Sequence, residues 1–209
     1  MKMRHIIPLA LVAFAGLSLG AGCPTVPKIE DRVVELALGA STTVSIPAVG
    51  VVNVYNQDAP YDLALDFNLN KTLSDAGVDL ADAKDIKLSG ISYRVTVPDP
   101  NSGRTITGAT VRAQRPPGTS QLLISSFSQN VDTVSGWTKA PLDSAGVTVI
   151  NGLLTDMLAS AKSGTPVANS LINYHVNGTS TPTGLSTSFT WEIRFDLTIV
   201  GSITVKVLN

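Results

Sequence analysis

Residues 189–207 read FTWEIRFDLTIVGSITVKV, and this segment carries the most regular pattern in the chain. Apolar side chains or glycine occupy every odd position, and polar side chains occupy all the even positions except 200. Successive side chains of a strand point to opposite faces of a sheet, so the pattern predicts a strand with one buried face and one wet face. Gly201 interrupts the apolar series without changing its phase, which fits either one bent strand or a hairpin over residues 200–202.

Two earlier segments show the same alternation. The first predicts a hairpin or a bent strand around residues 39–41, and the second predicts a half-buried strand. Their apolar positions are Val34, Leu36, Leu38, Val44 and Ile46 in the first segment, and Leu63, Leu65, Phe67 and Leu69 in the second. Residues 71–85 between the second segment and the next strand have a helical or turn-like composition.

The middle of the chain predicts three further strands. In the first, the apolar phase runs through Ile86 and Leu88 and then shifts by one residue, which predicts a β-bulge at Ser89-Gly90. The phase then continues through Ile91, Tyr93, Val95 and Val97. A turn at residues 98–103 leads to an expected partner strand over 105–114, and a second turn at 115–118 leads to a strand over 121–127.

One helix is predicted near residues 148–163. Its apolar residues recur at helical spacing, and Gly164 stands where a helix C-terminus favours glycine. Gly152 inside this segment lowers helix propensity by about 1 kcal/mol relative to alanine, so packing must supply the stability. The apolar stripe consists of Ile150, Leu153, Leu154, Met157, Leu158 and Ala161.

These segments predict a mainly β fold, an antiparallel two-sheet sandwich with one packed amphipathic helix. Charged residues make up only 15% of the chain, and the segment after residue 22 carries a small net negative charge. A chain without a basic surface is not expected to bind nucleic acid. The composition is typical of an extracellular β-rich domain.

The N-terminal segment has the composition of a secretory signal. Lys2 and Arg4 precede an uncharged apolar run over residues 6–19, and residues 20–22 supply the small side chains of a cleavage site. The run is shorter than the roughly 20 apolar residues that a membrane-spanning helix needs. Cys23, the only cysteine, follows directly.

This order of apolar run, small residues and Cys23 resembles the lipobox of bacterial lipoproteins. The resemblance implies cleavage before Cys23, a diacylglycerol on its thiol and an acyl group such as palmitate on its new amino group. Gly20 stands where the family usually has leucine, because Leu19 lies one place too early. The alternative is an ordinary signal peptide that leaves a free thiol, although an unpaired cysteine is unusual in an exported chain.

The resulting domain prediction is a signal peptide over 1–22, a lipidated tether over 23–31 and a β-sandwich domain over 32–209. The chain after residue 22 also resembles small uncharacterised β-sandwich lipoproteins of bacterial envelopes. That resemblance implies a membrane anchor through the N-terminal lipid, with the outer membrane as the expected location.

No catalytic constellation is recognisable. His175 is the only histidine after the signal, and the chain contains no GxSxG motif for a serine hydrolase. Asp75, Asp79, Asp82 and Asp85 cluster without calcium-loop spacing. We therefore predict no catalytic residue, no metal site, no cofactor and no enzyme activity.

Trp137 lies in a segment of loop-like composition, and we expect it either to cover a sheet edge or to contact a partner. The first functional hypothesis is a non-catalytic, lipid-anchored cell-envelope protein with a structural, assembly or partner-binding role. The second is a carrier of an apolar ligand in a cavity between the helix and the sheet, lined by the odd-numbered C-terminal residues. The third is an envelope hydrolase, which would need His175 to meet a serine and an aspartate.

Overall fold

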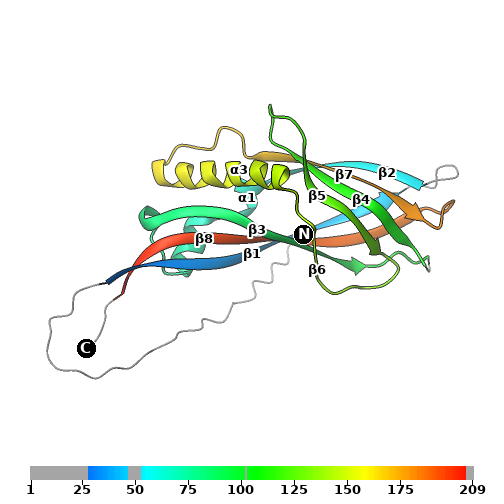
Figure 1. Cartoon of the computed structure of the whole chain (residues 1–209), viewed down its shortest axis with the longest axis horizontal. Helices are drawn as coiled ribbons and strands as arrows, with labels where there is room; N and C mark the ends of the chain where they lie inside the picture. Colours follow the sequence, from blue (N-terminus) through cyan, green and yellow to red (C-terminus); the bar gives the residue numbers. More distant parts are fainter. Residues whose placement is uncertain (1–27, 47–52, 102, 206–209) are drawn as a thin grey trace, which may run out of the picture. The chain divides into compact units, whose positions relative to one another are not determined.

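Figure 1 shows a computed structural model of the chain, which describes residues 28–46, 53–101 and 103–205. By its internal contacts the chain divides into a main unit, Glu30–Ile203, and a second unit formed by the two chain ends. Cys23 and the predicted signal peptide lie outside the described residues.

Strands account for most of the described chain. The strands are β1 (Lys28–Ile46), β2 (Asn53–Asp62), β3 (Ala83–Val97), β4 (Thr105–Gln114), β5 (Gln121–Asn130), β6 (Thr138–Lys139), β7 (Leu171–Thr181) and β8 (Thr187–Val205). The helices are α1 (Leu63–Asp66), α2 (Leu69–Asp75), the short 3-10 helix η1 (Leu80–Asp82) and α3 (Ser144–Ser163).

The strands form two four-stranded antiparallel sheets. Sheet A has the order β1-β8-β3-β6, and sheet B has the order β2-β7-β4-β5. Their inner faces enclose one hydrophobic core, to which every long strand contributes. The predicted fold class, a mainly β sandwich, is confirmed.

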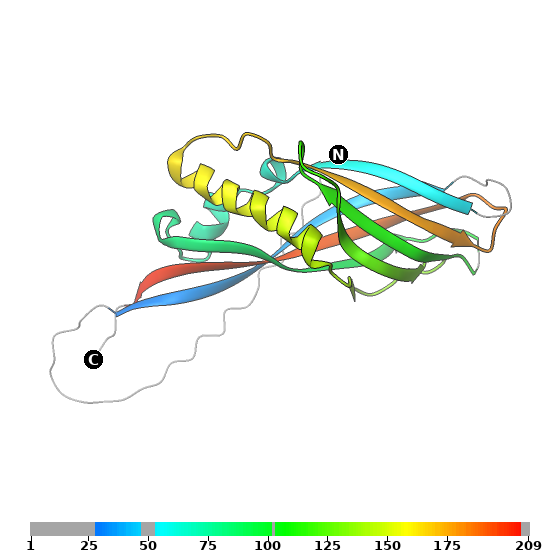
Figure 2. The ribbon, with the colours of Figure 1, turned by 45° about the horizontal axis from the view of Figure 1, so that its top comes forward.

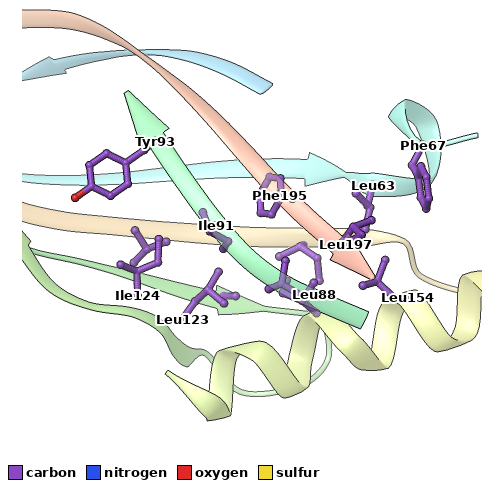
Figure 3. Close-up of a cluster of buried hydrophobic side chains, with 14 of the residues drawn as sticks. Leu63, Phe67, Leu88, Ile91, Tyr93, Leu123, Ile124, Leu154, Phe195 and Leu197 are labelled. Atoms are coloured by element: carbon purple, nitrogen blue, oxygen red, sulfur yellow. The ribbon is translucent and has the colours of Figure 1, made fainter. Parts of the chain in front are cut away.

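β8 confirms the strand predicted from the C-terminal pattern. It is one continuous strand, which resolves the choice between a bent strand and a hairpin. Phe189, Trp191 and Phe195 on its odd face are buried, whereas their even-numbered neighbours are partly exposed. Figure 3 shows Phe195 of β8 and Ile91 of β3 directed into the same cluster of buried side chains.

The aromatic residues in and against the core form two groups between the sheets. Tyr61, Tyr174 and Phe195 lie with ring centroids 6.1–6.5 Å apart, and Tyr93 and Trp191 lie 6.0 Å apart in the second group. Burial raises the pKa of Tyr174 far above its ordinary value, and the nearby Tyr61 raises it further. Burial also raises the pKa of Tyr93. Both phenols are therefore held in their neutral form.

Helix α3 confirms the predicted helix and begins four residues earlier than expected. Asp143 is its N-cap, and the Asp143 carboxylate accepts a hydrogen bond from Ala145 N at 2.9 Å. Gly164 ends the helix with φ 73°, the left-handed conformation that glycine adopts without strain. The helix packs against β3 and β5, and Asn151 Oδ1 accepts a hydrogen bond from Leu88 N of β3 at 2.8 Å.

The strand predicted over residues 63–69 is wrong. This segment forms α1 and the start of α2, and Leu65 is 80% exposed. Two side chains favour helical turns here: Asp62 accepts from Ala64 N, and Asn68 accepts from Lys71 N. The two caps accept hydrogen bonds from backbone N–H groups that, in a strand, would need a carbonyl of a neighbouring strand. These local hydrogen bonds therefore favour helical turns in spite of the alternating pattern.

Several strand boundaries also differ from the predictions. β1 is continuous through residues 39–41, and it includes residues 28–31, which the sequence assigns to the tether. β2 was not predicted at all, because its sequence NVYNQDAPYD has few apolar positions. The strand over 105–114 is β4, but it pairs with β5 and β7 of sheet B instead of β3.

In β3 the predicted bulge is confirmed by a register shift between Leu88 and Gly90. The expected inward position of Val97 is wrong, since its side chain is exposed. A second register shift between Val95 and Val97 accounts for this reversal of the phase.

Candidate functional site

Exposed apolar side chains gather at one end of the sandwich. Val54, Val97, Val134 and Leu185 are four of the seven large apolar residues that are exposed in the described part of the chain. They lie at or beside the loops that join β3 to β4, β5 to β6 and β7 to β8. We call residues 97–104, 130–137 and 181–188 the loop end.

Strand register places these loops together. Asn53 at the start of β2 pairs with Ser180 near the end of β7, and Thr105 at the start of β4 pairs with Asn130 at the end of β5. In sheet A, Val97 at the end of β3 pairs with Thr190 near the start of β8. These six strand termini therefore share one end of the sandwich, and Figure 2 shows the β7–β8 connection at the end opposite the start of β1.

A buried arginine holds the β7–β8 loop. Arg104, directly before β4, is 0% exposed. Its Nε donates to Thr187 Oγ1 at 2.9 Å, and its Nη2 donates to Leu185 O at 2.6 Å and also to Thr187 Oγ1. These contacts fix the loop relative to β4, although the buried Nη1 of Arg104 has no hydrogen-bond partner among the described residues.

A buried aspartate holds the same loop from the other sheet. Asp99 accepts hydrogen bonds from Asn101 N and Ser188 N, each at 2.7 Å. The Asn101 side chain in turn donates to Ser186 O at 3.2 Å. Side chains of the β3–β4 loop thus hydrogen-bond to backbone atoms of the β7–β8 loop and hold the two loops together.

The β5–β6 loop is joined to the β3–β4 loop in the same way. Asp132 accepts a hydrogen bond from Gly103 N at 2.6 Å. Asp99 N donates to Val131 O at 2.7 Å, and Val131 N donates to Arg104 O at 3.0 Å. All three loops are therefore fixed before any partner arrives, and a pre-ordered surface binds without a large loss of conformational entropy.

The surface that these loops present is almost uncharged. Among residues 97–104, 130–137 and 181–188 the only charged side chains are Asp99, Arg104 and Asp132. The first two are buried, and Asp132 is partly buried. The exposed side chains are thus apolar, hydroxyl or amide groups, which suit contact with an apolar, uncharged surface.

Trp137 is the last residue of the loop-end segment 130–137 and lies on the outer face of sheet A. Its ring is 37% exposed, and the guanidinium carbons of Arg94 and Arg194 lie 4.6 and 4.8 Å from the ring centroid. Arg94 forms an ion pair with Glu192, and Arg194 forms one with Asp196. These cation–π contacts and ion pairs hold the indole in place with part of its surface exposed, as in aromatic anchors of protein interfaces.

His175 lies in β7 on the outer face of sheet B. Its Nδ1 is 2.8 Å from Asp58 Oδ1 of β2, and the register places Arg112 of β4 opposite it on the other side. The hydrolase hypothesis required a serine with this histidine and an aspartate. The hydrogen bond described for His175 joins it to Asp58, and none described for it involves a serine.

The clustered aspartates are separated by the fold. Asp75 forms an ion pair with Lys71 on α2, and Asp85 forms one with Lys87 on β3. Within the described ranges, no group of three histidine, cysteine, aspartate or glutamate side chains is arranged to hold a metal ion. In those same ranges, no helix has the length and apolar character to span a bilayer.

A shallow groove of about 310 Å³ lies between the α1–α2 segment and α3. Its lining mixes apolar and amide or hydroxyl groups and includes no charged side chain and no residue of β8. It therefore differs from the cavity that the carrier hypothesis predicted. The lining residues are Ala64, Leu65, Phe67, Asn68, Leu69, Asn70, Met157, Ser160, Ala161 and Val167.

Sequence reasoning identified Trp137 as a possible contact residue, but it missed the loop end. Nothing in the sequence marks Arg104 as buried, because arginine usually lies on the surface. The available signal was the low charge of the three turn segments together with their exposed valines and leucine. That signal has meaning only once the strand order places the three turns side by side.

Comparisons with known proteins show no established family. No family description matches the chain, and no curated protein matches its sequence. Among solved structures, the decameric BFDV capsid protein is similar over 80% of this chain and 99% of that chain, with 10% identity and a TM-score of 0.35. A Desmodium yellow mottle tymovirus structure is similar over 100% of both chains, with 9% identity and a TM-score of 0.31.

Proposed function

We propose that this chain is a lipid-anchored protein of the bacterial cell envelope that binds a protein partner through its loop end and has no catalytic role. The observation that carries the binding role is the pre-ordered, nearly uncharged loop end with Val97, Val134 and Leu185 exposed. Exposed apolar groups on a rigid scaffold are typical of interaction surfaces.

The anchor rests on Cys23 and the signal segment before it. Only six residues lie between Cys23 and Glu30, the first residue of the sandwich unit. A fully extended chain spans about 3.3–3.6 Å per residue, so a lipid on Cys23 lies within roughly 25 Å of Glu30. Glu30 is the third residue of β1, and Figure 2 shows that β1 begins at the end opposite the β7–β8 connection.

Lipidation is tested by mass spectrometry of the protein purified from the membranes of its native organism. The expected N-terminal peptide begins at Cys23 and carries acyl groups, and Cys23→Ser should abolish both the acyl mass and the membrane fractionation. A wild-type peptide that begins at Cys23 or later without acyl groups would exclude the anchor.

Partner binding is tested by placing a photo-crosslinking amino acid at Val134 or at Leu185 in living cells. We expect one discrete crosslinked species from both positions, and we expect Val97→Asp to suppress it. Asn173, on the outer face of sheet B, is the matched control position and should give no such species. Equal, diffuse crosslinking from all three positions would contradict the proposed surface.

The groove beside α3 favours a second candidate function, a carrier of an apolar ligand. Phe67 and Met157 form part of its wall, and its volume lies at the lower limit of small-molecule sites. Native mass spectrometry tests this candidate, because a carrier should retain an apolar small molecule that Met157→Glu displaces. A purified protein without any bound small molecule would leave the first proposal as the sole candidate.

A further inference from the structure

Each sheet has two edge strands, and three of the four are protected against pairing with another chain. β6 is only two residues long. β2 contains Pro60, which has no amide hydrogen to donate, and carries the exposed Asp58. Short strands, prolines and charges are the usual devices that prevent edge-to-edge association of sheets.

β5, the third protected edge, is covered by the chain itself. Residues 141–143 run along it: Ser125 N donates to Pro141 O, and Asp143 N donates to Leu123 O, each at 2.9 Å. Leu142 also forms a bridge with Ile124. This segment therefore occupies the hydrogen-bonding positions that another strand would need.

β1 lacks the short length, the proline and the covering segment of the other three edges, and its charged residues are confined to its first eight positions. It is 19 residues long and contains no proline, and β8 is its neighbour in sheet A. Over residues 33–46 its only charged side chain is Glu35. Figure 2 shows β1, in blue, along the border of the sheet beside β8. A long edge of low charge with unpaired backbone groups is a template for another strand.

We propose that β1 of one molecule pairs with β1 of a second copy, antiparallel and about a twofold axis, so that two four-stranded sheets A join into one continuous sheet. Identical edges are complementary to each other in this arrangement, because each residue on one strand meets its symmetry partner on the other. Residues 33–46 extend over about 46 Å at 3.3 Å per residue, a contact long enough for a stable dimer.

The position of Glu35 agrees with this arrangement. In a pairing centred on Gly39, each Glu35 lies opposite Thr43 of the other copy, so the two carboxylates do not meet. Val33 and Ala37 are exposed on the outer face, and in this register they lie opposite positions 45 and 41, which are both serine. Neutral contacts of this kind make the dimer insensitive to salt.

The inference is tested on the full-length chain with Cys23→Ser, which contains no other cysteine and cannot carry the proposed lipid. This background separates the test from the proposed anchor and from partner binding at the loop end. Sedimentation equilibrium should give twice the monomer mass, unchanged at high salt. A monomer at about 100 μM would mean an affinity too weak to matter and would overturn the inference.

Two exposed valines provide a matched pair of lysine substitutions. Val33 on β1 is 59% exposed, and Val54 on β2 is 58% exposed, so neither change disturbs the core. Val33→Lys combined with Ala37→Lys should weaken the dimer at least tenfold, because it places like charges on both edges. Val54→Lys should leave the dimer intact. Equal weakening by the two changes would contradict pairing through β1.

Single cysteines along β1 test the antiparallel geometry. Of Ala37→Cys, Gly39→Cys and Thr43→Cys, each in the Cys23→Ser background, only Gly39→Cys should form an intermolecular disulfide, because position 39 meets itself at the twofold centre whereas 37 faces 41 and 43 faces 35. Efficient crosslinking at every position would indicate a parallel pairing or nonspecific collisions, and either result would overturn the proposed dimer. Lysine at position 54 again serves as the control that should not reduce crosslinking.

Discussion

Gly146, in the first turn of α3, lies against Leu123 of β5. A Cβ atom at position 146 would come within 2.7 Å of Leu123 Cβ, and closer still to Leu123 Cα and Leu122 O. The helix backbone thus touches the strand backbone at this point, and only glycine permits the approach. Gly152, one turn and a half further along the same helix, has open space around it.

Gly146→Ala should therefore destabilise the fold by about 1–3 kcal/mol, since the methyl group must displace backbone atoms of β5. Gly152→Ala should stabilise it by about 1 kcal/mol through helix propensity alone. Urea denaturation of both variants measures the difference. If the two alanines have the same effect, the close contact between α3 and β5 is incorrect.

Phe195→Asp should prevent stable folding, because it removes a buried ring and places an unpaired charge between the sheets. Asp196→Ser, one residue away on the outer face, should change the unfolding free energy by less than about 1 kcal/mol, since its ion pair with Arg194 lies near the surface. Circular dichroism and thermal denaturation compare the two. A folded Phe195→Asp protein would contradict the assigned inner face of β8.

Arg104→Lys should free the β7–β8 loop, because a lysine amine cannot reach Thr187 and Leu185 with the same fixed fork of donors. We expect a loss of about 1–3 kcal/mol, the usual consequence of leaving buried polar groups without a partner. Hydrogen exchange of residues 182–188 should become faster. Arg112→Lys, on the outer face of sheet B, should leave exchange in that loop unchanged.

Tyr174 should make stability fall in alkaline solution. Burial raises its pKa in the folded chain, so the unfolded chain loses the phenol proton first, near the ordinary pKa of about 10. The stabilising contribution is complete below pH 10 and decreases as the pH rises toward the higher pKa of the folded state. Urea denaturation at pH 9 and pH 11 measures this loss.

Tyr174→Phe is the matched variant for that measurement. It keeps the ring contacts with Tyr61 and Phe195 and removes the titrating group. The variant should show a smaller loss of stability above pH 10, and the remainder should come from Tyr93, whose pKa burial also raises. An identical pH dependence in both proteins would show that Tyr174 is not shielded from water.

The strongest sequence signals were those in which pattern and local chemistry agreed. The odd face of β8, the bulge at Gly90 and the end of α3 at Gly164 follow from side-chain period and glycine conformation, and all three are confirmed. The segment 63–69 was misassigned because Asp62 and Asn68 act as helix caps, and a strand period contains no information about caps.

The pairing of the strands and the burial of charged residues could not be predicted from the sequence. Turn residues 98–103 indicated a hairpin between β3 and β4, but β4 crosses to the other sheet, a choice that depends on long-range packing. Arg104 and Asp99 resemble ordinary surface residues until the loops around them are in place. The binding surface arises from that assembly, so no single segment carries its signature.

The unbroken course of β8 has a mechanical consequence. A pull between the start of β1 and the loop end acts along the length of β1 and β8, which are neighbours in sheet A. Hydrogen bonds between strands lie across that direction, so the load stresses them together in shear instead of opening them one after another. A domain held at one end and pulled at the other would therefore resist force in its strongest direction.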